Sequence, residues 1–268
     1  MKRARTIIVS LLTLALVSAG VPSLAAAGLS SILQKGELVV GTAGNMPPFN
    51  MKTTDGKLIG LDADLAKLMA GAMGVKLRLK IMSFAKLLPA LEAGKVDMIM
   101  SQMTITPRRN LKVAFVGPYF ISGKAFLTKR ETIARAEEAS EVDNPRVSLA
   151  TIKGSTSQYF VEAVIPKAKL VTTDNYDEAV QMVIDDKVDA MIADYPICVI
   201  SVYRFPNKGL VSVITPLTYE PLGIAMSGDD PLLLNWTENF LDVLKGSGRL
   251  EVLRKRWFED VSWLKRLP

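Results

Sequence analysis

Histidine is absent from this 268-residue sequence, and cysteine occurs once, at position 198. Without histidine, the chain cannot form a Ser-His-Asp or Cys-His nucleophilic pair. It also cannot build a zinc site with imidazole ligands. Because Cys198 is alone, an intramolecular disulfide and a cysteine-built metal cluster are excluded as well. We therefore expect no metal centre and no cofactor.

Charge of neither sign dominates the composition. The chain has 33 Lys and Arg residues against 27 Asp and Glu residues, a net charge of +6, and 49% of its residues are hydrophobic. These values are typical of a globular protein rather than a disordered one. No stripe of alternating basic and aromatic residues is present, so we expect no nucleic-acid partner.

The first 27 residues have the pattern of a secretory signal peptide. Three basic residues lie within the first five positions, an apolar run follows over residues 7–21, and Ala25-Ala26-Ala27 precedes Gly28. Small residues at this place are typical of a cleavage site. A single membrane anchor is the alternative, but no basic cluster follows the apolar run. Cleavage predicts an exported, periplasmic protein with a net charge of about +3.

The rest of the chain alternates short apolar segments with amphipathic ones. Strands are expected at 38–42, 76–81, 96–100, 146–152, 169–172, 187–192 and 223–226, and helices at 62–73, 84–93, 157–164, 179–186, 232–245 and 250–258. Asp62 is expected to cap the first of these helices. Residues 131–144 are charged and read as a loop. Strands that alternate with helices predict an α/β fold with parallel-rich sheets.

One part of this pattern occurs twice. A helix leads into Lys95-Val96-Asp97, and 92 residues later another helix leads into Lys187-Val188-Asp189. In both copies a short apolar strand follows. The repetition predicts two similar α/β lobes.

Several short motifs resemble a known family. They are Phe84, Thr104-Ile105-Thr106-Pro107-Arg108-Arg109, Ala193-Asp194, an opening Gly-Glu-Leu-Val-Val-Gly-Thr strand at 36–42, Gly-x-Asp-x-Asp-Leu at 60–65 and a closing Lys-x-Trp-Phe at 255–258. In this order, they resemble the extracytoplasmic solute-binding proteins of family 3, which serve amino-acid ABC transporters. The likeness covers nearly all of residues 33–258.

The resemblance implies the type 2 periplasmic binding protein fold, with two α/β lobes joined by two crossover strands. We place lobe 1 at residues 28–121 and 217–268, and lobe 2 at residues 122–216. The family also implies that the lobes close on a free amino acid by hinge motion, here near Ser122 and Pro216. The implied partner is an inner-membrane ABC permease, and the implied state is a monomer.

A free amino acid carries two opposite charges, so its binding site needs a cation and an anion. Arg109 is the candidate for the carboxylate, because a guanidinium can hold a carboxylate through two parallel hydrogen bonds. Asp194 is the candidate for the ammonium group. Each follows one of the two repeated strands, at the edge where α/β sheets bind ligands. The alternatives are a solvated arginine, the role given to Arg108, and a turn-forming aspartate before Pro196.

The resemblance adds further ligand contacts. Thr104 would assist Arg109, and the loop of Gly154, Ser155 and Thr156 would present backbone N–H groups at a helix N-terminus. Selectivity for the side chain is expected from Ala43, Met46, Phe84, Gln102, Tyr119 and Ile152. None of these carries a charge, so a neutral ligand is expected. Gln102 replaces the family's usual glycine. Gln102 and Glu220 are the two residues whose contact with the ligand is left open.

Two other functions remain open at this point. Cyclohexadienyl dehydratases resemble the same family, and the resemblance places a glutamate general acid at the start of a lobe 2 helix. This chain has Gln158 there, and an amide cannot donate the proton that a departing hydroxide needs. The third possibility is a sensor domain, although such sensors are normally fused to a membrane segment. We therefore expect a binding protein and not an enzyme.

Overall fold

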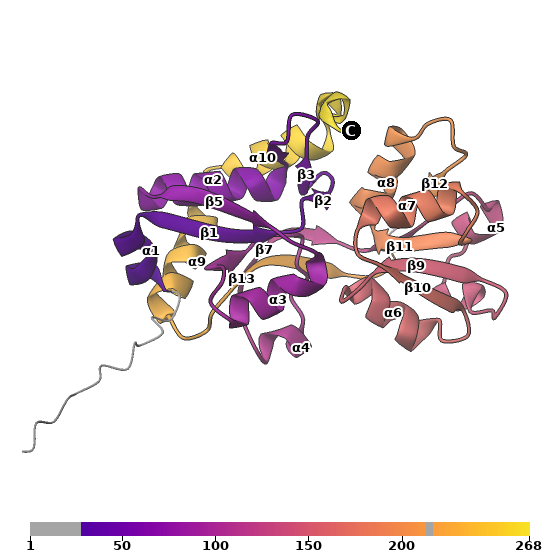
Figure 1. Cartoon of the computed structure of the whole chain (residues 1–268), viewed down its shortest axis with the longest axis horizontal. Coiled ribbons are helices and arrows are strands. Elements are labelled where there is room, and N and C mark those ends of the chain that lie inside the picture. Colours follow the sequence, from indigo (N-terminus) through magenta and orange to yellow (C-terminus); the bar gives the residue numbers. More distant parts are fainter. Residues whose placement is uncertain (1–27, 213–216) are drawn as a thin grey trace, which may run out of the picture.

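Two five-stranded sheets, each with helices on both faces, organise the chain (Figure 1). The computed structural model describes residues 28–212 and 217–268. The proposed signal peptide, residues 1–27, and the expected hinge position Pro216 lie outside the described residues. Within the described part, no helix combines the length and apolar character needed to cross a membrane.

The first sheet has the strand order β5-β1-β6-β13-β7. Its strands are β5 (Lys76–Ile81), β1 (Glu37–Thr42), β6 (Met98–Ile99), β13 (Glu220–Met226) and β7 (Ala114–Ser122). The strands β5, β1 and β6 are parallel, and β13 runs antiparallel to β6 and β7. We call this sheet and the helices packed on it lobe 1. Those helices are α1 (Leu29–Lys35), α2 (Leu61–Met73), α3 (Phe84–Glu92), α4 (Pro107–Asn110), α9 (Pro231–Gly246), α10 (Arg249–Phe258) and the short η2 (Ser262–Arg266).

The second sheet repeats this topology in the order β10-β9-β11-β8-β12. Its strands are β10 (Lys169–Thr173), β9 (Ser148–Ile152), β11 (Ala190–Asp194), β8 (Lys124–Thr128) and β12 (Val211–Ser212). Again three strands are parallel, and β8 runs antiparallel to β11 and β12. This sheet forms lobe 2 with α5 (Glu131–Ala134), η1 (Ala139–Val142), α6 (Thr156–Val164), α7 (Tyr176–Ile184) and α8 (Tyr195–Arg204). The parallel-rich, two-lobed α/β fold expected from the sequence is confirmed.

The repeated Lys-Val-Asp motif makes the same contact in both lobes. The carboxylate of Asp97 accepts a hydrogen bond from the backbone N–H of Val39 in β1, at 2.8 Å. The carboxylate of Asp189 accepts one from the backbone N–H of Ser148 in β9, at 2.7 Å. Each aspartate therefore anchors the parallel neighbour of the strand that begins directly after it.

Two chain segments connect the lobes. In the first, β7 ends at Ser122 and β8 begins at Lys124. In the second, the chain returns through residues 217–219 into β13, where Glu220 pairs with Ser122. The two segments are joined by further hydrogen bonds, including Leu217 N–H to the Lys124 carbonyl oxygen at 2.8 Å. The expected first hinge at Ser122 therefore coincides with an observed crossover.

Three local expectations were wrong. Asp62 does not cap α2, because the helix begins at Leu61 after Gly60, and the Asp62 side chain bonds elsewhere. Residues 131–144 include the helical turns α5 and η1 rather than a continuous loop. The strand expected at 96–100 is only the two-residue β6. A third small sheet of β2 (Asn45–Met46), β3 (Asn50–Lys52) and β4 (Leu58–Ile59) was not anticipated.

The single cysteine provides a check on the packing of lobe 2. Cys198 lies in α8, is 0% exposed, and its thiol contacts the Ala125 carbonyl oxygen at 3.6 Å. Burial raises the pKa of this thiol well above its ordinary value. Because the thiolate is the reactive form, Cys198 should not react with a thiol reagent such as DTNB in the native protein, and should react fully in urea. Lys208→Cys adds an exposed control thiol. If Cys198 in the native wild type reacted with DTNB as fast as the control thiol at position 208, the observed burial of Cys198 would be contradicted.

Candidate functional site

A small cavity lies between the two lobes. It is lined by Met46, Phe84, Gln102, Thr104, Arg109, Ser155, Thr156, Ser157, Tyr176 and Asp194. Eight of the twelve residues that the sequence predicted around the ligand are in this set, and Gly154, Ala43, Tyr119 and Ile152 are not. The cavity measures about 10 Å³, which is room for about one water molecule. The lobes are therefore closed on each other in this structure.

Arg109 forms the lobe 1 end of the cavity. Arg109 lies in α4. Thr106 caps this helix, because its side chain accepts a hydrogen bond from the Arg109 backbone N–H at 3.2 Å. The guanidinium is 6% exposed and donates to the carbonyl oxygens of Thr104 at 2.8 Å and Gly154 at 3.3 Å. Burial lowers its pKa, but arginine remains charged. The structure thus holds a fixed buried cation at this end.

Asp194 ends β11 at the opposite side of the cavity and is 4% exposed. One carboxylate oxygen pairs with the Lys124 ammonium at 2.8 Å, and the other accepts a hydrogen bond from the Gln102 amide at 2.8 Å. Burial raises the pKa of Asp194, and the positive charge of Lys124 acts against that rise. Because both neighbouring donors need an acceptor, the contacts favour the ionised carboxylate.

Gln102 links the lobes across the cavity under backbone strain. Its φ of 52° lies in the left-handed region, which non-glycine residues rarely adopt. This explains the glycine usual at the position. While the Gln102 amide nitrogen donates to Asp194, the amide oxygen is buried without a hydrogen-bond partner among the described residues. That oxygen is therefore an acceptor available to a ligand.

The loop before α6 closes the cavity from lobe 2. Ser155 caps α6 by accepting a hydrogen bond from Gln158 N–H at 3.1 Å. The Thr156 hydroxyl lies 3.4 Å from the Thr104 hydroxyl of lobe 1. A Cβ at Gly154 would lie 3.4 Å from Ala85 in α3, and the φ of Gly154 is +76°. Glycine therefore allows this loop to approach lobe 1 closely.

Sequence reasoning missed three residues of this region. Ser157 and Tyr176 line the cavity, and Lys124 lies behind Asp194, paired with Glu220. Glu220, whose contact with a ligand the sequence left open, is not among the lining residues. Lys124 was detectable in principle, because it opens a five-residue strand that otherwise has only apolar residues and one threonine. Three residues proposed for selectivity, Ala43, Tyr119 and Ile152, are not among the lining residues.

Arg108, expected to be solvated, makes a second contact between the lobes. It is exposed, and its guanidinium carbon lies 4.4 Å from the centre of the Tyr159 ring in α6. This is within the range of a cation–π interaction. A cavity of about 420 Å³ lies beside this contact and shares Arg109 and Thr156 with the inner cavity. The outer cavity marks the rim of the cleft between the lobes.

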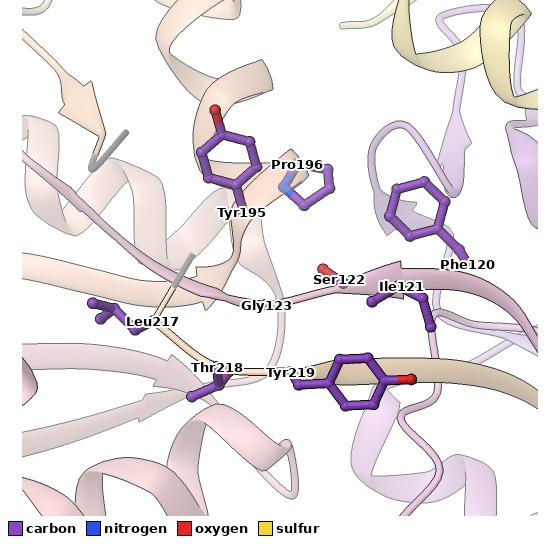
Figure 2. A pocket seen from close by; sticks show the side chains of 9 residues that line it. All are labelled: Phe120, Ile121, Ser122, Gly123, Tyr195, Pro196, Leu217, Thr218 and Tyr219. Atoms are coloured by element: carbon purple, nitrogen blue, oxygen red, sulfur yellow. The ribbon is translucent and has the colours of Figure 1, made fainter. Parts of the chain in front are cut away.

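A third cavity, of about 520 Å³, lies against the crossover segments (Figure 2). The two segments run past each other there, with Tyr195 and Pro196 from the start of α8 beside them. Tyr219 in the second segment is 70% exposed. The crossovers are therefore open to solvent on this side.

A buried carboxylate in lobe 1 holds Gln102 in place. Asp62 is 1% exposed and accepts hydrogen bonds from the Tyr119 hydroxyl at 2.7 Å, the Asn50 amide at 2.7 Å and the Gln102 backbone N–H at 3.0 Å. Burial, with no cation in contact among the described residues, raises the pKa of Asp62 to about 6. Tyr119 thus does not line the cavity, but its hydroxyl holds Asp62, which in turn holds the backbone of Gln102.

Comparison with known proteins shows which family and which folds this chain resembles. The model of the family described as bacterial extracellular solute-binding proteins, family 3, matches residues 38–260. The ABC transporter arginine-binding protein 1 of Escherichia coli strain K12 is 26% identical over 221 residues, which cover 81% of this chain and 89% of that protein. The cyclohexadienyl dehydratase of Pseudomonas aeruginosa is also 26% identical, over 96% of both chains.

Among solved structures, a binding component of an ABC transporter from Wolinella succinogenes, complexed with lysine, is 42% identical. It superposes with a TM-score of 0.81 and covers 86% of this chain and 99% of its own. The fold is therefore shared with a protein whose structure was solved with a bound amino acid.

The Asp62 network generates a prediction about stability. The pKa of Asp62 rises from 3.8 to about 6 on folding. The folded protein therefore holds the proton more tightly. The stabilisation from this proton is complete below the unfolded pKa of 3.8 and is lost as the pH rises to the folded pKa of about 6. The whole loss should be about 3 kcal/mol. The difference in unfolding free energy between wild type and Asp62→Asn, measured in urea from pH 3 to 7, should change by this amount. If the unfolding free energies of wild type and Asp62→Asn changed equally with pH, the raised pKa of Asp62 would be contradicted.

Proposed function

The chain belongs to the bacterial extracellular solute-binding proteins of family 3, and from this premise we propose that it captures a free amino acid with a neutral side chain. The ligand is held between the closing lobes and delivered to the permease of an ABC transporter. The proposed location is the periplasm, after signal-peptide cleavage, and the proposed state is a monomer.

One observation carries the proposal. A buried cation, Arg109 of lobe 1, and a buried anion, Asp194 of lobe 2, line the same cavity. A zwitterion offers the complementary pair, a carboxylate for Arg109 and an ammonium group for Asp194. Thr104, Thr156 and Ser155 add short polar groups beside these charges. Each charged group of the ligand would thus exchange its hydrating water for an oppositely charged side chain held in place by the protein.

The rest of the lining favours a neutral side chain. Besides Arg109 and Asp194, the described lining residues are uncharged, and Met46, Phe84 and Tyr176 supply its apolar part. A charged side chain there would be desolvated without a partner. The E. coli relative is named for arginine and the Wolinella structure contains lysine. Our proposal therefore assigns this chain a different ligand class from those two.

The closed geometry supports capture by lobe movement. A cavity of about 10 Å³ cannot receive an amino acid unless the lobes first separate. Direct contacts such as Gln102 to Asp194 and Arg108 to Tyr159 must break in that step. We propose the bending points at the two crossovers, which divide the chain into residues 28–121 with 217–268 and residues 122–216.

We propose binding rather than catalysis, although a dehydratase is among the relatives. Gln158 cannot donate a proton as an acid does, and its amide is engaged with Gly154 N–H and Glu162, each at 2.8 Å. Asp194 is the one carboxyl group among the described lining residues, and it already accepts from Lys124 and Gln102. Prephenate turnover by the purified protein would overturn this part of the proposal.

The two charged ends should control affinity. A thermal-shift screen of the twenty amino acids should identify a neutral ligand, since a ligand at 100 times its Kd adds about 2.7 kcal/mol of stability. Arg109→Gln or Asp194→Asn should then weaken binding by about 2–5 kcal/mol in calorimetry, because each leaves a ligand charge buried and unpaired. The neighbouring Arg108→Gln is the matched control and should cost at most about 1 kcal/mol. Arg109→Gln with wild-type affinity would refute the carboxylate assignment.

Lobe closure should be visible in solution. Adding the ligand at saturation should reduce the radius of gyration measured by X-ray scattering, because hinge bending brings the lobes together. The Arg109→Gln variant at the same ligand concentration, below its own Kd, should show no such change. An unchanged radius for the saturated wild type would count against capture by closure.

A further inference from the structure

Lys124 is an unusual residue in its position. It is the first residue of β8, it is 0% exposed, and its side chain is among the largest that are fully buried. Its ammonium contacts Asp194 at 2.8 Å, Glu220 at 3.1 Å and the Thr156 hydroxyl at 2.7 Å. A lysine ammonium has three N–H donors, so these contacts match its full capacity.

The partners of Lys124 are themselves held in place. The Thr156 hydroxyl donates to one oxygen of Glu220 at 3.1 Å, and Thr218 donates to the other at 3.2 Å. The Lys124 backbone N–H donates to Thr218 at 3.0 Å. Lys124 and Glu220 are thus fixed to each other across the two crossover segments.

Lys124 approaches Asp194 from behind the cavity. It contacts one carboxylate oxygen, Oδ1, whereas the cavity-lining Gln102 contacts Oδ2. Neither Lys124 nor Glu220 lines the cavity. A ligand can therefore reach Asp194 at Oδ2 without displacing Lys124, and the ion pair remains part of the site when the cleft is occupied.

The charges at this end of the cavity determine which charge the ligand's side chain can carry. Two carboxylates, Asp194 and Glu220, face one ammonium, Lys124, and the ammonium group of a ligand would balance them. At the other end, Arg109 would balance the ligand's carboxylate. A neutral side chain completes the pairing, whereas a cationic side chain would add a buried charge without a partner.

We infer that Lys124 is a specificity-determining residue that excludes amino acids with cationic side chains. Asp194 and Glu220 together need two cations, and Lys124 supplies one of them, so that only the ligand's ammonium group is needed for the other. The inference rests on the proposed function, because it takes Asp194 as the ammonium site. Without Lys124, two buried carboxylates would face the ligand, and a basic amino acid would bring both cations needed to balance them.

The test is calorimetry of glutamine, leucine, lysine and arginine with the purified wild type and its variants. Wild type should bind one or both neutral ligands at least tenfold more tightly than lysine or arginine. In Lys124→Met, the affinity ratio of lysine or arginine to the neutral ligand should rise at least tenfold. Lys124→Met/Glu220→Gln, which removes one charge of each sign, should return this ratio to the wild-type value. Lys129→Met, directly after the far end of β8, is the matched control and should leave the ratio unchanged.

Glu220→Gln keeps the inference testable if Lys124→Met does not fold. This variant keeps the pair of Lys124 and Asp194 but removes one anion, so neutral ligands should bind at least tenfold more weakly. Tight binding of lysine or arginine by wild type would overturn the inference, as would an unchanged ratio in folded Lys124→Met. No binding of any of the twenty amino acids by wild type would instead refute the proposed function.

Discussion

The burial of charge is the physical constraint on which the cleft depends. Lys124, Asp194, Glu220 and Arg109 are each less than one-tenth exposed. An ion removed from water must be paired and hydrogen-bonded. Here the pairs connect β8, β11, β13 and α6, so the requirement for pairing fixes the crossover segments relative to lobe 2. The crossover segments therefore cannot leave lobe 2 without exposing or separating Lys124, Asp194 and Glu220, whereas Arg109 in lobe 1 can move with its lobe.

The second constraint comes from the duplicated topology. In each lobe an aspartate before a short strand anchors the neighbouring strand, as Asp97 does for Val39 and Asp189 for Ser148. The strand that follows ends at the cleft. The segment beyond β6 supplies Arg109 in one lobe, and the last residue of β11 supplies Asp194 in the other. Two similar scaffolds therefore present opposite charges to each other. A ligand with two opposite charges can hold the lobes together only because the two scaffolds face each other in this way.

Sequence reasoning recovered what depends on local pattern and strand order. The parallel strands and the repeat follow from residues close together in the chain, whereas Arg109 and Asp194 were singled out with the help of the family resemblance. Lys124 was missed because its partners Thr156 and Asp194 lie 32 and 70 residues away, and no periodic pattern marks a buried lysine. Asp62 has the right type and place for a helix cap. Tyr119 and Gln102, 57 and 40 residues away, instead draw its carboxylate into a buried network.

Gln102 shows how these networks act on a ligand. Its backbone is held by Asp62 of lobe 1, and its amide donates to Asp194 of lobe 2. A ligand can favour the closed arrangement only by the difference between the contacts it makes and those it replaces. On the proposed function, the ligand's ammonium group replaces the Gln102 amide at Asp194, exchanging a neutral donor for a charged one. The unpartnered Gln102 oxygen is an acceptor placed beside the same ammonium group. On the proposed function, the ligand therefore replaces the direct hydrogen bond between the lobes with a charged bridge from Asp194 of lobe 2 to Gln102 of lobe 1.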